Sequence, residues 1–163
     1  MNRKGISAIV ATVLIILITV AAVTIIWAAI IPMINNQLDR GIVCLDAVQQ
    51  ITIKEGGYTC RNNDTVSVQI KRGSGDMNLA DVEVLLSSAG STTSFSLIDP
   101  TTTTSPASMS VALLPGGNEE KTYLISTASI TGDVDKVEIA PVISVGNTQE
   151  TCDVSASVTL RDC

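Results

Sequence analysis

The sequence contains no histidine and few aromatic residues. Without histidine, the chain lacks the side chain that most often acts as a general acid or base near neutral pH and is the commonest metal ligand. Its aromatic residues are Trp27, Tyr58, Phe95 and Tyr123. Because stacking platforms for sugars or bases need aromatic rings on one surface, a lectin-like or nucleotide-reading surface is disfavoured.

Positive charge is also scarce. The chain holds 10 lysine and arginine residues against 16 aspartate and glutamate residues, for a formal net charge of −6. No run of basic residues forms a patch that would neutralise nucleic-acid phosphates. We therefore expect no nucleic-acid partner, and we interpret the acidic, serine- and threonine-rich remainder as the solvated surface of an extracellular domain.

Recognisable catalytic and metal-binding motifs are missing as well. There is no G-x-S-x-G elbow and no phosphate-binding loop, and Asp133-Val134-Asp135 lacks the further oxygen ligands of a calcium loop. The cysteines lack the short spacing of zinc knuckles. We expect no enzymatic activity, no cofactor and no metal; an exported hydrolase would need converging carboxylates, which the sequence does not locate.

Charge is absent from one long stretch, Ile6 to Ile31, which reads ISAIVATVLIILITVAAVTIIWAAII. As a helix it would measure roughly 39 Å, more than the ~30 Å hydrocarbon layer of a bilayer. A removable secretory signal would have an apolar stretch of about 7 to 15 residues before a small-residue cleavage site. The longer run predicts a transmembrane helix instead.

The charges that flank this stretch predict its orientation. Arg3 and Lys4 precede it, and the first charged residues after it are Asp39 and Arg40. Positive charge favours the cytoplasmic side of a membrane, and Trp27 is placed to lie in the outer interfacial belt. We expect a single-pass chain with its N-terminus in the cytoplasm and its C-terminal part outside the cell.

The first residues resemble the N-terminus of a known family. Arg3-Lys4-Gly5, followed by ISAIVAT at residues 6–12 and an aliphatic run, is similar to archaeal type IV pilins and related archaellin-like proteins. In that family a membrane peptidase cuts directly after the glycine of what is called a class III signal peptide. The resemblance covers the leader, residues 1–5, and the apolar stretch, and it implies cleavage between Gly5 and Ile6.

The resemblance also implies a function and partners. Processed subunits of this family pack their helices into the core of a surface filament. The implied partners are therefore other copies of the chain, the prepilin peptidase and the pilus assembly machinery. Removing Arg3 and Lys4 would ease exit from lipid, because a charge in hydrocarbon costs several kcal/mol. Bacterial type IV pilins carry a glutamate where this chain has Val10, so packing alone would set the register.

The pattern changes to period two after the helix, which we expect to span residues 6–40. In residues 41–163, about seven or eight short alternating segments are separated by glycine, proline and asparagine turns. We predict an antiparallel, immunoglobulin-like β-sandwich, with a barrel as the alternative. The alternating apolar positions include Leu45, Ala47, Ile51, Ile53, Val66, Val68, Ile70, Val82, Val84, Leu86, Phe95, Leu97, Met109, Val111, Leu113, Tyr123, Ile125, Val134, Val137, Ile139, Val154, Ala156, Val158 and Leu160.

Four cysteines follow the apolar stretch, in the compartment where disulfides persist: Cys44, Cys60, Cys152 and Cys163. If residues 45–54 and 153–161 are extended strands of about 30 Å each, cysteines adjacent in sequence cannot approach within the roughly 7 Å that bridging needs. In an immunoglobulin-like topology the first strand often runs parallel to the last. That favours pairing Cys44 with Cys152 and Cys60 with Cys163, whereas antiparallel neighbours would give the nested pairing.

One N-glycosylation sequon, Asn63-Asp64-Thr65, lies where a loop between strands is expected. The tripeptide also occurs by chance. Asn63 is therefore a candidate glycosylation site whose occupancy the sequence leaves open.

Two functional hypotheses follow. The favoured one is a structural subunit of an archaeal type IV pilus-like filament, which polymerises through its N-terminal helix and presents the β domain for contact with surfaces or other cells. The alternative is a single-pass anchored extracellular binding module, or a minor or accessory pilin, that does not form the bulk filament.

Overall fold

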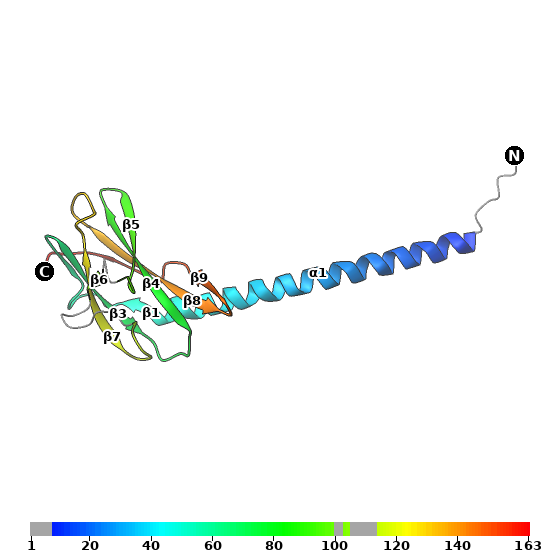
Figure 1. Ribbon diagram of the computed structural model, residues 1–163, viewed down its shortest axis with the longest axis horizontal. Helices are drawn as coiled ribbons and strands as arrows, with labels where there is room; N and C mark the ends of the chain where they lie inside the picture. The colour runs from blue at the N-terminus through cyan, green and yellow to red at the C-terminus, as the bar shows by residue number, and fades with distance from the viewer. Residues whose placement is uncertain (1–7, 100–102, 105–113) are drawn as a thin grey trace. The chain divides into compact units, whose positions relative to one another are not determined.

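The computed structural model describes residues 8–99, 103–104 and 114–163, which form one long helix and two antiparallel sheets (Figure 1). The chain divides into two compact units between Asp39 and Arg40. The first unit is helical, and the second, residues 40–163, is called the head domain below. An apolar N-terminal helix followed by an antiparallel β domain is the coarse architecture that the sequence predicted.

The helix α1 runs from Ala8 to Gln50, well beyond the end that the sequence predicted near residue 40. It continues through Pro32 and Gly41, two residues that disfavour a helix interior. The segment from Leu45 to Gln50, predicted as part of a strand, is therefore helical. The period-two interpretation of Leu45 and Ala47 was wrong, and only Ile51–Ile53 forms the strand β1.

Burial explains why the helix continues past Gly41. Ala47 is fully buried in the core of the head domain, and Val43, Cys44 and Val48 pack against that core. These positions recur at three- to five-residue spacing, which places them on one helical face. The packing of this face offsets a helix cost of about 1 kcal/mol at Gly41, whose surroundings are open.

The first sheet has the strand order β1-β3-β7-β6, and β2 pairs with the other end of β3. All these pairings are antiparallel. Besides β1, its strands are β2 (Cys60–Asn62), β3 (Thr65–Arg72), β6 (Thr103–Thr104) and β7 (Glu120–Ser126).

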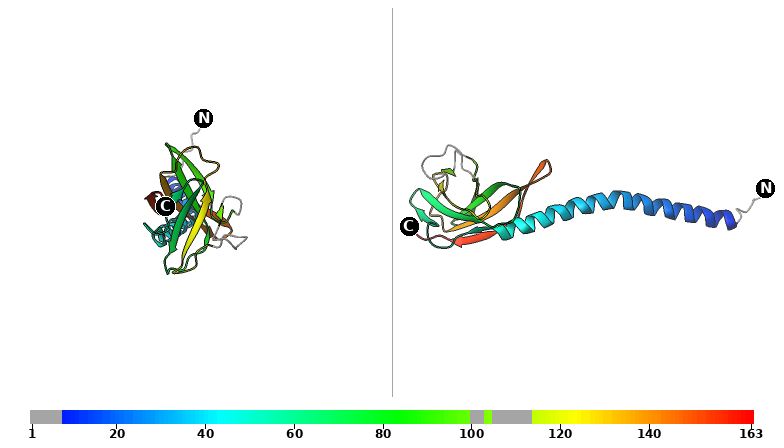
Figure 2. Two further views of the ribbon diagram at one scale, coloured as in Figure 1. Left: turned by 90° about the vertical axis from the view of Figure 1, so that its left-hand side faces the viewer. Right: turned by 90° about the horizontal axis from the view of Figure 1, so that it is seen from below.

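The second sheet has the order β10-β8-β4-β5, with β9 paired to the other end of β8, and it is antiparallel too. Among the described strands the pairing defines two sheets rather than one, and both are curled (Figure 2). The strands are β4 (Leu79–Ser88), β5 (Ser91–Ser96), β8 (Lys136–Val145), β9 (Thr148–Thr151) and β10 (Ala156–Thr159).

The core of the head domain comes from the inward faces of the two sheets. The predicted alternation is confirmed in β3, β4, β7 and β8, where apolar side chains two residues apart are buried. The fully buried members are Val66, Val68, Ile70, Val82, Val84, Leu86, Tyr123, Ile125, Val137 and Ile139. The strand expected at Met109–Leu113 lies outside the described residues, and β2, β6 and β9 were not predicted as strands.

Tyr123 gives the fold a specific response to alkaline pH. Its side chain is fully buried, and burial, with a smaller effect of the charge on Glu119, raises the pKa of its phenol well above the ordinary value. A tyrosine side chain in the unfolded chain loses its proton at about pH 10. We therefore expect the contribution of Tyr123 to stability to be constant below about pH 10 and to fall above it, because the unfolded chain releases this proton first.

The variant Tyr123→Phe tests this expectation. It should flatten the alkaline fall in the free energy of unfolding, measured by urea titration at successive pH values. The control is Tyr58→Phe, because Tyr58 is 69% exposed and is the chain's other tyrosine. An equal alkaline fall in wild type and in Tyr123→Phe would contradict the assignment.

Candidate functional site

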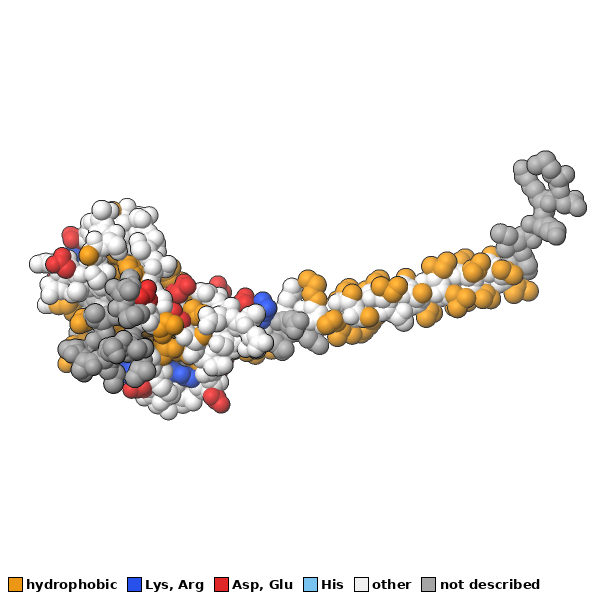
Figure 3. All heavy atoms as spheres, viewed as in Figure 1, with side chains coloured by type: hydrophobic (Ala, Val, Ile, Leu, Met, Phe, Trp, Pro, Cys, Tyr) orange, Lys and Arg blue, Asp and Glu red, His pale blue; other side chains and the backbone are white. Residues whose placement is uncertain are grey.

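The most distinctive surface of the protein is the apolar helix segment, Ala8–Ile34 of α1. It spans 27 residues with a mean hydropathy of 3.0, which is long and apolar enough to cross a membrane. Its large apolar side chains are exposed over fractions from 42% at Ile31 to 73% at Ile9. Figure 3 shows apolar side chains along its whole length. A helix that is apolar all round is stable in lipid or among other helices, but not in water.

The polar side chains of this segment form hydrogen bonds within their own helix. The hydroxyls of Thr12, Thr19 and Thr24 each donate to the carbonyl oxygen three residues earlier, at 2.9 Å. Such bonds remove the cost of an unsatisfied hydroxyl in an apolar surrounding. The threonines therefore do not oppose burial of the segment.

The residues of the expected leader cleavage, Arg3, Lys4, Gly5 and Ile6, lie outside the described residues. Val10, where bacterial pilins have a glutamate, is described and is 51% exposed near the start of α1.

The last turns of α1 are tied to the head domain by a disulfide. Cys44 bonds to Cys152, with a Cα–Cα distance of 5.3 Å, and Cys152 is 7% exposed. This bridge joins a helix to the residue after β9, not the first strand to the last as the sequence argument assumed. The pairing matches the one favoured from the sequence, although the premise that Cys44 precedes a strand was wrong.

Hydrogen bonds hold the same helix end. The carbonyl of Gln50 accepts the backbone N–H of Gly73 at 2.8 Å, and its side-chain Nε2 donates to Asp46 at 2.8 Å. A Cβ atom at Gly75 would meet the side-chain amide of Gln50, so a larger residue there would displace that side chain where this loop passes the helix. The contact between Gln50 and the loop at Gly75 was not predicted from the sequence, although the four-residue spacing of Asp46 and Gln50 is a local signal of a helix.

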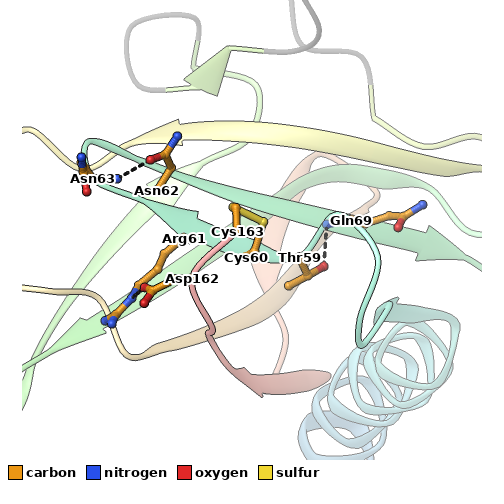
Figure 4. Close-up of a disulfide and its surroundings, with 8 residues drawn as sticks. All are labelled: Thr59, Cys60, Arg61, Asn62, Asn63, Gln69, Asp162 and Cys163. Carbon is orange, nitrogen blue, oxygen red and sulfur yellow. Dashed lines mark hydrogen bonds and ion pairs between the residues drawn. A yellow bond between two sulfur atoms is a disulfide. The ribbon is translucent and has the colours of Figure 1, made fainter.

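The second disulfide joins Cys60 to Cys163, with a Cα–Cα distance of 5.1 Å (Figure 4). This pair also matches the favoured pairing. Here the two segments do run parallel, as a parallel bridge pairs Arg61 with Asp162. The N–H of Arg61 donates to the carbonyl of Arg161 at 2.8 Å, and the N–H of Cys163 donates to Arg61 at 2.9 Å.

A polar cleft of about 440 Å³ opens beside this disulfide. Arg61 extends along it, with Nε donating to Asp162 at 2.6 Å and Nη1 to the carbonyl of Val134 at 3.1 Å. The bond to Asp162 is the main reason that the pKa of Arg61 is raised, with Asp133 adding to it. Thr127 and Asn63 also line the cleft, so it presents hydrogen-bonding groups rather than an apolar floor.

A second group of charges lies on the first sheet. Glu120 accepts from Lys54 at 2.9 Å, and this bond, with the charge of the nearby Lys71, lowers the pKa of its carboxyl. The backbone N–H of Gly116 is the main cause of the lowered pKa of Glu119. These are solvent-accessible pairs of the kind that contribute little to stability, and they form no site.

The sequon Asn63-Asp64-Thr65 lies at the hairpin that joins β2 to β3. Asn63 and Asp64 form the two-residue turn, both with exposed side chains, and Thr65 begins β3. The expected loop between strands is therefore a tight turn at the edge of the polar cleft.

Among the residues that the structure describes, no group of three or more acidic, cysteine or histidine side chains is placed to hold a metal ion. Comparison with protein-family models, curated proteins and solved structures finds no match for the chain. The features that bear on function are therefore the apolar helix segment and the two disulfides that close the head domain.

Proposed function

We propose that the protein is a structural subunit of an archaeal type IV pilus-like surface filament, which polymerises through α1 after cleavage between Gly5 and Ile6. Before assembly the chain spans the membrane once, with its N-terminus in the cytoplasm and its head domain outside. Its partners are other copies of itself, the prepilin peptidase, the assembly machinery and the membrane. Catalysis and cofactor binding have no part in this role.

The observation that carries the proposal is the exposure of the apolar helix segment on all sides. Burying apolar surface contributes about 25 cal/mol per Å², so this helix needs lipid before assembly or neighbouring helices afterwards. An ordinary membrane anchor would account for the segment alone. The resemblance of the leader and the apolar stretch to archaeal pilins favours the helix bundle of a filament.

The part of α1 inside the head domain supports contacts between copies. Ile42 and Leu45 are 66% and 67% exposed, on a stretch whose other face packs into the core. Two large aliphatic side chains exposed this far on one helical stretch are suited to packing against a neighbour. With Val10 in place of a charged residue, such apolar contacts would set the register of the filament.

The two disulfides of the head domain support a role under mechanical tension. Two disulfides, Cys44–Cys152 and Cys60–Cys163, close loops of 108 and 103 residues. The first anchors the helix by which a filament would pull on the domain. We also propose that the two curled sheets form an immunoglobulin-like sandwich, which their common core supports.

Purified surface filaments and membranes from the native source test the proposal. Peptide mapping should find the chain as a main filament component with Ile6 as its first residue. If membranes contain the processed chain and filaments lack it, the protein is an anchored binding module or an accessory pilin instead. Retained Arg3 and Lys4 on filament-bound chains would overturn the assignment.

Substitution in the leader gives a matched prediction. Gly5→Leu should block cleavage, keep both cations on the helix and reduce filament yield to background, because the charges would have to enter an apolar bundle. Asn2→Ala, in the same leader, should be processed normally. Intact-mass measurement of membrane-bound chains and electron microscopy of filaments give the two readouts, and filaments of normal yield from Gly5→Leu would contradict the proposal.

A further inference from the structure

We propose that Asn63 carries an N-linked glycan whose first sugars lie in the polar cleft beside the Cys60–Cys163 disulfide. Asn63-Asp64-Thr65 is the sole sequon in the chain, so one asparagine would carry all N-linked sugar. The inference rests on the proposed function only in placing the head domain outside the cytoplasm.

The turn presents the acceptor amide while the neighbouring residues hold the turn in place. Asn62 Oδ1 accepts the backbone N–H of Asn63 at 2.9 Å (Figure 4). The carbonyl of Asp64 accepts the N–H of Thr127 at 3.0 Å. The side-chain amide of Asn63 makes no hydrogen bond to any described residue, and neither does the hydroxyl of Thr65. The two groups that define a sequon are therefore available to a transferase.

The position of the turn favours access. β3 carries the sequon turn at its Thr65 end, and its Arg72 end pairs with Ile51, directly after the last residue of α1. Eight residues of strand separate the two ends by roughly 25 Å. The turn therefore lies at the end of β3 that is remote from the last residue of α1.

The cleft beside the turn matches the chemistry of a sugar. Sugars present hydroxyls that donate and accept, and the cleft offers both kinds of partner from Arg61, Asn62, Thr127 and Asp133. Its volume of about 440 Å³ is within the usual range for small-molecule sites. Covalent attachment at its edge would compensate for the lack of an aromatic platform, because tethering raises the local concentration of the sugar.

Attachment of the glycan transfers a saccharide to Asn63 from a donor in which the saccharide is activated as a glycosyl phosphate. A bond forms between Nδ2 of Asn63 and the anomeric carbon, while the bond from that carbon to the phosphate oxygen breaks. The bonding electron pair stays on the phosphate, and Nδ2 loses one proton to a base of the transferase.

Mass spectrometry of the native protein tests the site. We expect the tryptic peptide of residues 62–71 to be heavier by whole sugar residues, and the same digest reports the N-terminus. Processed chains with an unmodified peptide would overturn this inference and leave the proposed function standing. Glycosylated chains that retain Arg3 and Lys4 would overturn the proposed function alone.

Matched variants separate the sequon from the fold. Asn63→Gln and Thr65→Val should lose all of the added mass, whereas Thr65→Ser should keep it. Asn147→Gln is the control, because Asn147 is an exposed asparagine between β8 and β9 without a threonine or serine two residues on. Added mass that persists in Asn63→Gln would overturn the site.

The rate of disulfide reduction tests where the sugars lie. Cys163 lines the cleft, so dithiothreitol should reduce Cys60–Cys163 several-fold more slowly in the glycosylated protein than in Asn63→Gln. Cys44–Cys152 in the same samples is the internal control and should be reduced at an unchanged rate. Equal rates for Cys60–Cys163 in the two proteins would overturn the placement of the sugars in the cleft.

Discussion

Replacing Cys44 and Cys152 together by serine is expected to destabilise the head domain by about 4 to 5 kcal/mol. The disulfide closes a loop of 108 residues, and the chain-entropy model gives roughly 4.7 kcal/mol for a loop of about 100 residues. A loss of this size is a large part of the stability of a domain, which is about 5 to 15 kcal/mol. Urea unfolding of the full chain in detergent, followed by circular dichroism of the β domain, measures it.

The same double variant should also loosen the end of α1. Without the bridge, the helix beyond Gly41 depends on burial of Ala47 and on its bonds to the Gly73 loop. Amide hydrogens of residues 41–50 should therefore exchange faster, while those of β4 and β8 change only through global unfolding.

The second disulfide provides the control for loop closure. Cys60→Ser with Cys163→Ser opens a loop of 103 residues, so chain entropy predicts nearly the same loss of stability. Exchange at residues 41–50 should not change locally in this variant. A loss below about 1 kcal/mol for the Cys44 pair would contradict the structural role given to that bridge.

Placing aspartate at both Val20 and Val23 should remove the chain from membranes and abolish filaments. Near the centre of a membrane helix each aspartate costs about 2.5 to 3.5 kcal/mol, and each lost valine forfeits about 0.3 to 0.6 kcal/mol. Together the two changes cost about 6 to 8 kcal/mol. Each remaining aliphatic residue favours membrane insertion by only about 0.3 to 0.6 kcal/mol, so the two changes cancel most of the favourable free energy of insertion of the helix.

Fractionation after an alkaline wash measures this effect as the share of protein left in the membrane pellet. The matched control, Val20→Ala with Val23→Ala, shortens the same side chains without adding charge and should stay with the membrane. Thr19→Val should also be tolerated, because the Thr19 hydroxyl bonds only within its own helix. A doubly charged variant that remains in the pellet at the wild-type level would contradict burial of this segment.

The sequence predicted strands well where the local alternation of apolar residues agrees with their burial in the folded domain. In the middle of β3 and β4 the apolar side chains alternate and are buried, at Val66, Val68 and Ile70 and at Val82, Val84 and Leu86, so local alternation and tertiary burial coincide. At Leu45 and Ala47 the two disagree. Ala47 fits a strand by its alternation with Leu45 and a helix by its four-residue spacing from Val43, and only the packing of Ala47 against the core selects the helix.

The candidate site also has features that the sequence predicted and features that it did not. The sequence favoured the observed disulfide pairs over the nested pairing, but one premise behind that preference failed because Cys44 lies on a helix. The cleft was not predicted at all. It brings Arg61, Asp133 and Asp162 together from distant parts of the chain, and no local pattern records such proximity.

The sequence by itself determined the apolar helix and the alternating strands, because hydropathy and period are properties of neighbouring residues. Tertiary structure alone decided where the helix ends, which segments run parallel at Cys60 and how a sequon comes to border a polar cleft. These features depend on contacts between residues far apart in the chain. Their energies arise only when the core and the disulfides bring those residues together.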